Sequence, residues 1–325
     1  MRSIVCIGYA KCGTTLLDEA VRAVDGMSAP RVGKEIKFFL PRNFPSRQQK
    51  DEYYKNFDSN LDAPYLTFEA SPQYLHQEFP IFLDVLKNIK ETIADPIIVI
   101  CLRHPVLRAY SHYVHNLQEF ALYGEGVFNK RADLLRKGCC RSFEESLVET
   151  RRLKTRYAKG ISAAIRIFGR ARIRLFFLES DSSALGDWMV QNLQAPPRVA
   201  EKLNEIGSGI PVFSRRPIPN YFVDGSDVIA YGAGLKQFVR YANLSQGQIE
   251  SLKRGQEKWT THLASGVVAR MLEKYFSNDL KECAKITADS RFLDYLREPT
   301  RDVTAGLSDE SFLRTVHCYC VEKRG

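Results

Sequence analysis

The chain has 325 residues, 44% of them hydrophobic and 26% charged. This balance is typical of a globular protein with a substantial core, and it excludes a chain that is disordered throughout. Forty-seven Lys and Arg outnumber 38 Asp and Glu, which gives a net charge of +9. A surplus of this size favours anionic ligands, such as nucleotides, nucleic acids, anionic glycans or lipid head groups.

Cysteine usage and hydropathy bear on the cellular compartment. The eight cysteines show no disulfide-scaffold spacing, and Cys6 and Cys101 lie in apolar runs that we expect to be buried, as is usual for reduced thiols in a cytoplasm. No apolar run approaches the roughly 18 residues that a membrane-spanning helix needs. A strand is expected almost at Met1, which leaves no room for a signal peptide. We therefore expect a cytoplasmic protein without a transmembrane segment.

Short apolar runs alternate with helical patterns along the first two thirds of the chain. Apolar runs typical of buried strands occur at 3–7, 65–68, 97–102 and 173–178. Helical spacing of apolar residues occurs at 16–24, 47–57, 80–91, 105–120, 143–168 and 182–193. This alternation predicts an α/β protein with a P-loop-like three-layer fold, in which a central parallel sheet is flanked by helices.

The last third of the chain has a different pattern. Residues 208–219 are rich in Gly, Pro and Arg, which indicates a long loop, and the pattern beyond them is mostly helical. We expect residues 1–207 to form the α/β core. Residues 208–325, with their loop and mainly helical C-terminal region, are expected to complete the same domain.

The segment Gly8-Tyr-Ala-Lys-Cys-Gly-Thr-Thr15 has glycines at the spacing of a P-loop, between a predicted strand and a predicted helix. Backbone N–H groups and the helix N-terminus can bind phosphate in that setting. A loop that binds ATP or GTP carries its lysine directly after the second glycine, followed by a Ser or Thr that holds Mg²⁺. Here Thr14 takes the lysine position and Lys11 lies inside the loop, which suits a donor with one 5′-phosphosulfate.

The predicted strand at 97–102 ends in Arg103-His104-Pro105 and not in the acidic residue that helps to hold Mg²⁺ in many P-loop enzymes. A guanidinium at a strand end, with the Ser111 hydroxyl eight residues later, is a plausible clamp for a second phosphate. Near the C-terminus, His317-Cys318-Tyr319-Cys320 has no second pair at zinc-site spacing. We therefore predict no metal site.

Four segments carry a resemblance to a known family. Residues 8–16 resemble the 5′-phosphosulfate loop of sulfotransferases that use 3′-phosphoadenosine 5′-phosphosulfate (PAPS), and residues 98–113 resemble their 3′-phosphate motif. Residues 34–39 and 68–75 are similar to segments of the heparan-type branch, which sulfates carbohydrates. The resemblance covers roughly residues 1–195. The sequence departs from the family pattern at Cys12, at Ala70, where the branch has a lysine, and at Ala164, where tryptophan is common.

The resemblance implies transfer of a sulfuryl group from PAPS to a hydroxyl or amine of a carbohydrate, with 3′-phosphoadenosine 5′-phosphate (PAP) as product. Glu35 would be the general base, and Lys11 would stabilise charge on the departing phosphate oxygen. Contacts to the donor are expected from Lys11, Cys12, Gly13, Thr14, Thr15, Arg103, Ser111, Arg215 and Arg216. Contacts to the acceptor are expected from Glu69, Lys37, His112 and Tyr157. His104, directly before Pro105, is expected to be structural.

Two other functions remain open from the sequence. One is a P-loop nucleotide kinase, which the displaced lysine disfavours. The other is a non-catalytic polyanion-binding protein that uses residues 130–174. This segment contains fourteen Lys and Arg but only four Asp and Glu. That segment fits a solvated basic helix face as well as an anion-binding surface, such as one for an anionic glycan. No nucleic-acid module is recognisable, so we expect no nucleic-acid partner. The sequence does not specify the oligomeric state.

Overall fold

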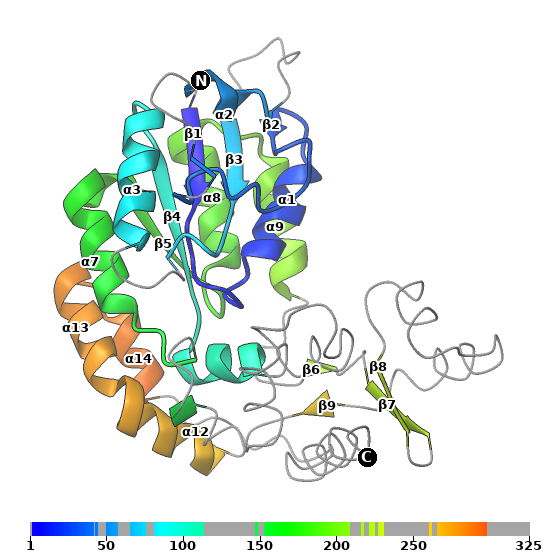
Figure 1. Cartoon of the computed structure of the whole chain (residues 1–325), viewed down its shortest axis with the longest axis vertical. Coiled ribbons are helices and arrows are strands. Elements are labelled where there is room, and N and C mark those ends of the chain that lie inside the picture. Colours follow the sequence, from blue (N-terminus) through cyan, green and yellow to red (C-terminus); the bar gives the residue numbers. More distant parts are fainter. Residues whose placement is uncertain are drawn as a thin grey trace. The chain divides into compact units, whose positions relative to one another are not determined.

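The structure, a computed structural model, contains a five-stranded parallel sheet (Figure 1). Its strands are β1 (Arg2–Cys6), β2 (Met27–Ser28), β3 (Leu66–Ala70), β4 (Ile97–Leu102) and β5 (Ile173–Phe177), in the order β2-β3-β1-β4-β5. The structure describes residues 2–41, 43–44, 50–57, 66–75, 81–113, 147–148, 153–208, 216–217, 221–224, 227–230, 260–261 and 265–297.

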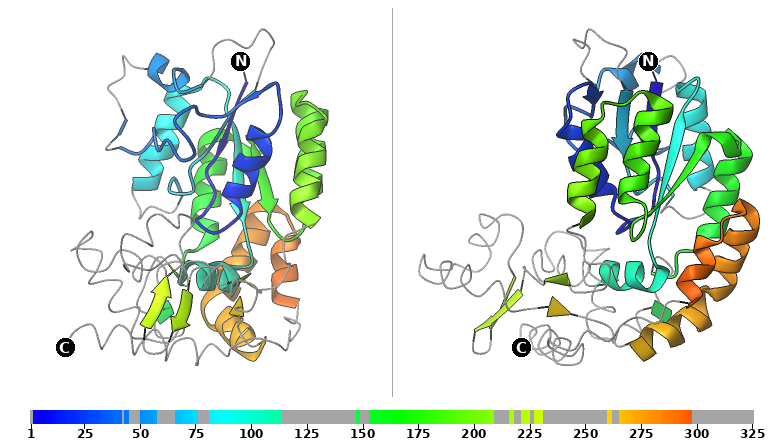
Figure 2. Two further views of the ribbon diagram at one scale, coloured as in Figure 1. Left: turned by 90° about the vertical axis from the view of Figure 1, so that its right-hand side faces the viewer. Right: turned by 180° about the vertical axis from the view of Figure 1, so that it is seen from behind.

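Helices cover both faces of the sheet (Figures 1 and 2). α1 (Thr14–Arg22), α8 (Ser182–Leu193) and α9 (Arg198–Ser208) pack together on one face, while α3 (Ile81–Thr92) and α7 (Tyr157–Phe168) cover the other. Every residue of β3 and β4 is buried, as expected of strands between two helical layers. The predicted α/β fold with a central parallel sheet is therefore confirmed.

The chain divides into two compact units. The first, formed by Met1–Arg108, Thr155–Val212 and Ser277–Leu296, holds the sheet, α13 (Ser277–Thr287), which packs on α7, and most of α14 (Arg291–Arg297). The same unit holds α2 (Lys50–Tyr54) and the short helix η1 (Arg170–Arg172). The C-terminal region thus supplies two helices to the unit that holds the sheet. The boundary expected between residues 207 and 208 stays a prediction.

The second unit is formed by Ala109–Lys154, Phe213–Phe276 and Arg297–Gly325. Its described elements include two short antiparallel pairs, which the mainly helical pattern of the sequence did not predict. β6 (Arg216–Pro217) pairs with β9 (Thr260–Thr261), and β7 (Tyr221–Asp224) pairs with β8 (Asp227–Ala230). They are followed by α12 (Ser265–Met271) and the π-helical segment η3 (Leu272–Phe276).

The start of α7 corrects the single helix that the sequence predicts over 143–168. Residues 153–156 are not helical, and α7 begins at Tyr157. The Asp279 carboxylate of α13 accepts hydrogen bonds from the backbone N–H groups of Tyr157 (2.6 Å) and Ala158 (3.2 Å). A carboxylate at these amides satisfies donors that the first helical turn leaves unpaired. The boundary is therefore set by a residue 122 positions away in sequence.

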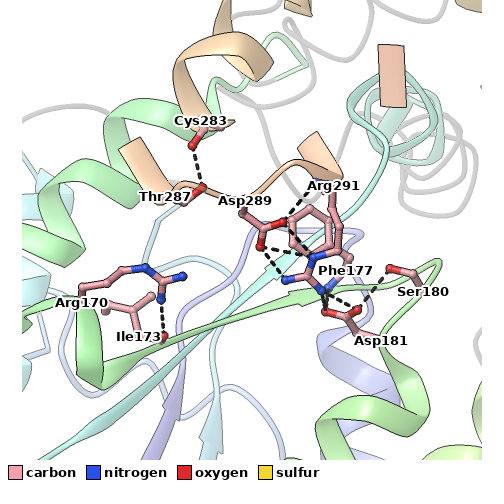
Figure 3. A network of polar contacts seen from close by, with 9 residues as sticks. All are labelled: Arg170, Ile173, Phe177, Ser180, Asp181, Cys283, Thr287, Asp289 and Arg291. Carbon is pink, nitrogen blue, oxygen red and sulfur yellow. Dashed lines mark hydrogen bonds and ion pairs between the residues drawn. The ribbon is translucent and has the colours of Figure 1, made fainter. Parts of the chain in front are cut away.

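A charged network joins the end of β5 to the start of α14 (Figure 3). The Arg291 guanidinium donates to both oxygens of the buried Asp181 carboxylate, at 2.7 and 2.6 Å, and to Asp289 at 2.6 Å. It also lies 4.2 Å from the ring centroid of Phe177. Since Asp181 accepts from the Phe177 N–H as well, the network compensates the charge of this carboxylate and ties α14 to the sheet.

The strand order places a topological switch point between β1 and β4. The chain leaves β1 towards β2 and β3, whereas it leaves β4 towards β5. In open α/β sheets, ligands bind outside the carboxyl ends of the strands at such a point. The loop after β1 and the residues after β4 therefore mark the place to look for a site. In the part of the chain that the structure describes, no helix is long and apolar enough to cross a membrane.

Candidate phosphate-binding site

The loop that follows β1 lies directly against β4. The Ile7 N–H donates to the Val99 carbonyl oxygen at 2.9 Å, and the Tyr9 N–H to that of Cys101 at 3.4 Å. Between them, a Cβ on Gly8 would lie only 2.4 Å from the Cys101 Cβ. Only glycine fits this approach, so the first glycine of the predicted P-loop is explained by packing against β4.

The second glycine of the loop starts the following helix. Gly13 is the N-cap of α1, with a φ of 88°, and a Cβ there would lie 2.5 Å from Leu178 Cδ1. The Leu17 N–H donates to the Gly13 carbonyl oxygen, which is the first backbone hydrogen bond of the helix. The amides of residues 14–16 lie before that bond, at the open end of the helix. Those amides and the helix dipole favour an anion at this end of α1.

The interior of the loop packs on Tyr157. Cys12 is fully buried, and burial raises the pKa of its thiol to about 12. Its sulfur lies 3.9 Å from the Tyr157 hydroxyl, and its N–H donates to the Tyr9 carbonyl oxygen at 3.2 Å. Tyr157 is also buried, and its hydroxyl donates to the Arg103 carbonyl oxygen at 2.8 Å. Both side chains support the loop from inside, and their predicted ligand contacts stay predictions.

Arg103 follows β4 and reaches the same loop. Its Nη1 donates to the Lys11 carbonyl oxygen at 3.5 Å, and its Nε lies 3.6 Å from Glu179 Oε1. Glu179 follows β5, accepts from the His104 N–H and from the Tyr295 hydroxyl, and has a pKa raised by burial. The side chains of Arg103 and Glu179 expose only 18% and 14% of their surface. Glu179 therefore orients the Arg103 guanidinium at the edge of the sheet where the parallel strands end.

His104 is buried beside Arg103, with its ring edge-on to that of Tyr295 at 5.2 Å. Burial lowers the pKa of its imidazole from 6.5 to about 4. The imidazole is therefore neutral at pH 7. This environment agrees with the structural role that the sequence predicts.

Glu35 lies beside the phosphate loop. Its Oε1 accepts a hydrogen bond from Lys34 Nζ at 2.9 Å, and its Oε2 lies 3.7 Å from Lys37 Nζ. Lys34 Nζ also donates to Thr15 Oγ1 at 2.8 Å, so one ammonium joins the carboxylate to the first turn of α1. The side chain of Glu35 is 27% exposed. The structure thus brings the predicted base and the predicted phosphate loop together.

Glu69, the other predicted carboxylate, is fully buried near the end of β3. Its Oε1 accepts hydrogen bonds from the hydroxyls of Ser71 (2.9 Å) and Tyr74. Burial raises the pKa of its carboxyl from 4.5 to about 7, although these hydrogen bonds oppose the shift. Ser71 Oγ in turn accepts from the Lys37 N–H at 3.3 Å. Glu69 therefore lies beneath the segment that carries Glu35, and its predicted acceptor contact stays a prediction.

The remaining predicted site residues belong to the second unit. Ser111 is buried and His112 half-buried on a helix described over residues 105–113. Arg216 lies in strand β6, and Arg215 lies outside the described residues. A shared site for these residues and Arg103 stays a prediction. Most of the basic segment between residues 130 and 152 also lies outside the described residues.

Sequence reasoning missed three charged residues near the loop: Lys34, Glu179 and Arg108. Arg108 is completely buried, and its charge lowers the pKa of the Cys12 thiol against the effect of burial. The position of Glu179 directly after a predicted strand could have indicated it, since the carboxyl ends of parallel strands meet at one edge. For Lys34, its place directly before Glu35 in the sequence gives no indication of a contact with the phosphate loop. Its contact with Thr15 depends on the tertiary structure.

Comparisons with known proteins leave the family open. No family model matches the sequence, and no curated protein matches it. Among solved structures, a sulfotransferase from Alicyclobacillus acidocaldarius is similar with a TM-score of 0.48 and 17% sequence identity, over 90% of this chain and 99% of that chain. A similarity this weak establishes neither a family nor an activity. Among the described residues, no group of three or more His, Cys, Asp and Glu is arranged to hold a metal ion.

The buried carboxyl of Glu69 should make stability depend on pH. The pKa of Glu69 is about 7 in the folded chain, against the ordinary value of 4.5 that applies to the unfolded chain. Between these two values the folded chain holds a proton that the unfolded chain releases. The stabilisation is fully present below pH 4.5 and is lost as the pH rises to about 7, a change of about 3 kcal/mol. His104, with its lowered pKa, acts in the opposite direction between about pH 4 and 6.5.

The comparison of wild type with Glu69→Gln isolates this effect, because His104 titrates equally in both proteins. We expect the free energy of unfolding of the wild type, minus that of the variant, to fall by about 3 kcal/mol from pH 4.5 to pH 7.5 in urea titrations. The control is Glu91→Gln, which removes an exposed carboxylate from the same unit. A difference for Glu69→Gln that does not vary with pH would contradict the raised pKa.

Proposed function

We propose that this protein is a PAPS-dependent sulfotransferase with Glu35 as its general base. The observation that carries the proposal is the contact of one ammonium, that of Lys34, with both the Glu35 carboxylate and Thr15 of the phosphate loop. A base for an acceptor is needed within reach of the transferring group. The loop lysine displaced to position 11 favours a phosphosulfate donor over a nucleoside triphosphate.

The proposed reaction combines proton removal from the acceptor, transfer of the sulfuryl group and stabilisation of charge on the leaving phosphate. The Glu35 carboxylate takes the proton of the acceptor hydroxyl or amine as its oxygen or nitrogen forms a bond to sulfur. The bond between sulfur and the bridging phosphate oxygen breaks, and PAP leaves with the electron pair. Lys11 and the amides at the start of α1 stabilise the negative charge that develops on that oxygen. No step in this scheme calls for a metal ligand from the loop.

The donor contacts follow from the placement of the loop and the strand ends. The loop residues Lys11, Cys12, Gly13, Thr14 and Thr15 would form the binding site for the 5′-phosphosulfate. Cys12 would contribute by holding the loop, since its thiol is buried and its N–H donates to the Tyr9 carbonyl oxygen. Arg103 would bind the 3′-phosphate together with Ser111. The Arg103 guanidinium lies 3.5 Å from the Lys11 carbonyl oxygen, and this proximity supports one ligand that contacts both.

The proposed acceptor is a carbohydrate. Support comes from the segments 34–39 and 68–75, which resemble those of carbohydrate sulfotransferases and which the structure joins through Ser71 and the Lys37 N–H. Lys37 would contact the acceptor directly. We propose an anionic sugar, because the positive charge between residues 130 and 174 favours one.

Binding of PAP tests the proposed function. We expect PAP to bind in the low-micromolar range or tighter, about −8 kcal/mol, and to raise the melting temperature more than ATP with Mg²⁺ or heparin does. Chelation of divalent metals with EDTA should leave the affinity unchanged. A preference for ATP with strict dependence on Mg²⁺ would indicate a nucleotide kinase instead. A response to heparin alone would indicate a polyanion-binding protein.

A further inference from the structure

The Lys34 ammonium lies between the two parts of the proposed active site. Its Nζ is 2.8 Å from Thr15 Oγ1 and 2.9 Å from Glu35 Oε1. An ammonium carries three N–H donors. With the described residues, Lys34 Nζ makes these two hydrogen bonds, so its third N–H is available to a ligand. The Lys34 side chain is 20% exposed, so it is partly shielded and still accessible.

Thr15 locates this ammonium at an anion-binding position. It is the second residue of α1, in the turn whose amides precede the helical hydrogen-bond ladder. Because Thr15 belongs to this same turn, we expect its hydroxyl to lie within hydrogen-bonding reach of a phosphate oxygen bound by these amides. A cation 2.8 Å from that hydroxyl can therefore contact the same phosphate, and hydrogen bonds between charged partners are the stronger ones.

The segment around Lys34 is held in place from its other side. Glu35 and Lys37 both have left-handed backbone conformations, with φ of 66° and 56°, which non-glycine residues adopt only when their surroundings enforce it. The enforcing contacts include the hydrogen bond from the Lys37 N–H to Ser71 Oγ and that from Asn43 Nδ2 to the Lys37 carbonyl oxygen, at 3.3 and 3.0 Å. These constraints distinguish Lys34 and Glu35 from an ordinary surface ion pair.

We propose that Lys34 has a double role in this site: its ammonium binds the 5′-phosphate end of the donor and positions the Glu35 carboxylate against it. This inference rests on the proposed function. Because the same ammonium contacts both groups, filling the phosphate loop and orienting the base are coupled. Lys34 is thus a donor-binding residue and, through Glu35, a positioning residue for the proton transfer.

Three nucleotides separate this role from a general structural one. We expect Lys34→Met to weaken PAP and adenosine 5′-phosphate about tenfold in calorimetry, because both carry the 5′-phosphate that Lys34 contacts. Adenosine 3′-phosphate lacks that group and should change by less than about twofold. Lys34→Arg, which keeps the charge, should remain within about threefold of wild type for all three ligands. Lys34→Gln provides a second uncharged variant in case the methionine variant does not fold.

The control is Lys55→Met, which removes an exposed lysine of the same unit and should change none of the three affinities. Turnover gives a second measurement, because Lys34 is also proposed to position Glu35. In a Glu35→Gln background, Lys34→Met should lower turnover little further, because Lys34 acts on turnover through Glu35.

The outcomes separate this inference from the proposed function. Unchanged PAP affinity in both uncharged Lys34 variants would overturn the role of Lys34 and leave the enzyme assignment intact. Equal weakening of all three nucleotides would show a structural effect and would also overturn it. Failure of the wild-type protein to bind PAP would instead contradict the proposed function itself.

Discussion

Replacement of Glu35 by glutamine should lower turnover about 100-fold or more and leave PAP affinity within about threefold of wild type. The amide keeps the shape of the side chain and its hydrogen bond from Lys34, but it cannot take a proton from the acceptor. Because the carboxylate is not itself a donor-binding group, the binding site for PAP stays intact. Labelled PAPS, with the best acceptor from a panel of glycans, phenols and small alcohols, measures the turnover.

The matched control is Glu91→Gln, which removes an exposed carboxylate from the end of α3 in the same unit. It should retain wild-type turnover and PAP affinity. Near-normal turnover of Glu35→Gln with the best acceptor would show that another residue removes the proton. The histidines near the predicted donor and acceptor contacts, His112 and His104, would then be tested next, although burial lowers the pKa of His104.

Arg103→Ala should weaken PAP about tenfold to 100-fold, because it removes a charged, two-pronged contact to the proposed 3′-phosphate. The two monophosphates should respond to Arg103→Ala in the opposite way to that expected for Lys34→Met. Adenosine 3′-phosphate should lose affinity to a similar degree, whereas adenosine 5′-phosphate should change by less than about threefold. Ser111→Ala should weaken PAP in the same direction by a smaller factor, since a neutral hydroxyl contributes less than a guanidinium.

The control for Arg103 is Arg172→Ala, which removes an exposed arginine that pairs with Asp95 at the surface. It should change neither affinity nor melting temperature by much. Arg103→Ala leaves the Glu179 carboxylate without its guanidinium partner, so the melting temperature has to be measured alongside the binding. Loss of affinity for adenosine 5′-phosphate alone would assign Arg103 to the other end of the donor.

The site could be predicted from the sequence where local pattern and sheet geometry were sufficient. The P-loop glycines and Arg103 follow separate predicted strands, and parallel strands end at one edge, so their proximity was predictable. The structure joins them through the contact of Arg103 with the Lys11 carbonyl oxygen. The long single helix over 143–168 was wrong, because its true start depends on the Asp279 carboxylate of another helix.

Burial of polar side chains could not be predicted in the same way. Glu69 and Tyr157 were assigned to the acceptor from their motif positions, yet both are fully buried under the loops that they support. A motif marks the type and spacing of residues, whereas the direction of a side chain depends on how neighbouring elements pack. The contact between Lys34 and Thr15 has the same origin, since these residues are 19 positions apart.

The sequence by itself determined the α/β class, the four longest strands of the sheet, the phosphate loop and the candidate base. These depend on apolar runs, on glycines and on local order, which are readable along the chain. The tertiary structure decided which charges meet. It placed Lys34 between Thr15 and Glu35, Glu179 against Arg103 and Arg291 against Asp181. Such pairs join segments that only packing brings together, because their energies depend on distances and burial that the sequence does not contain.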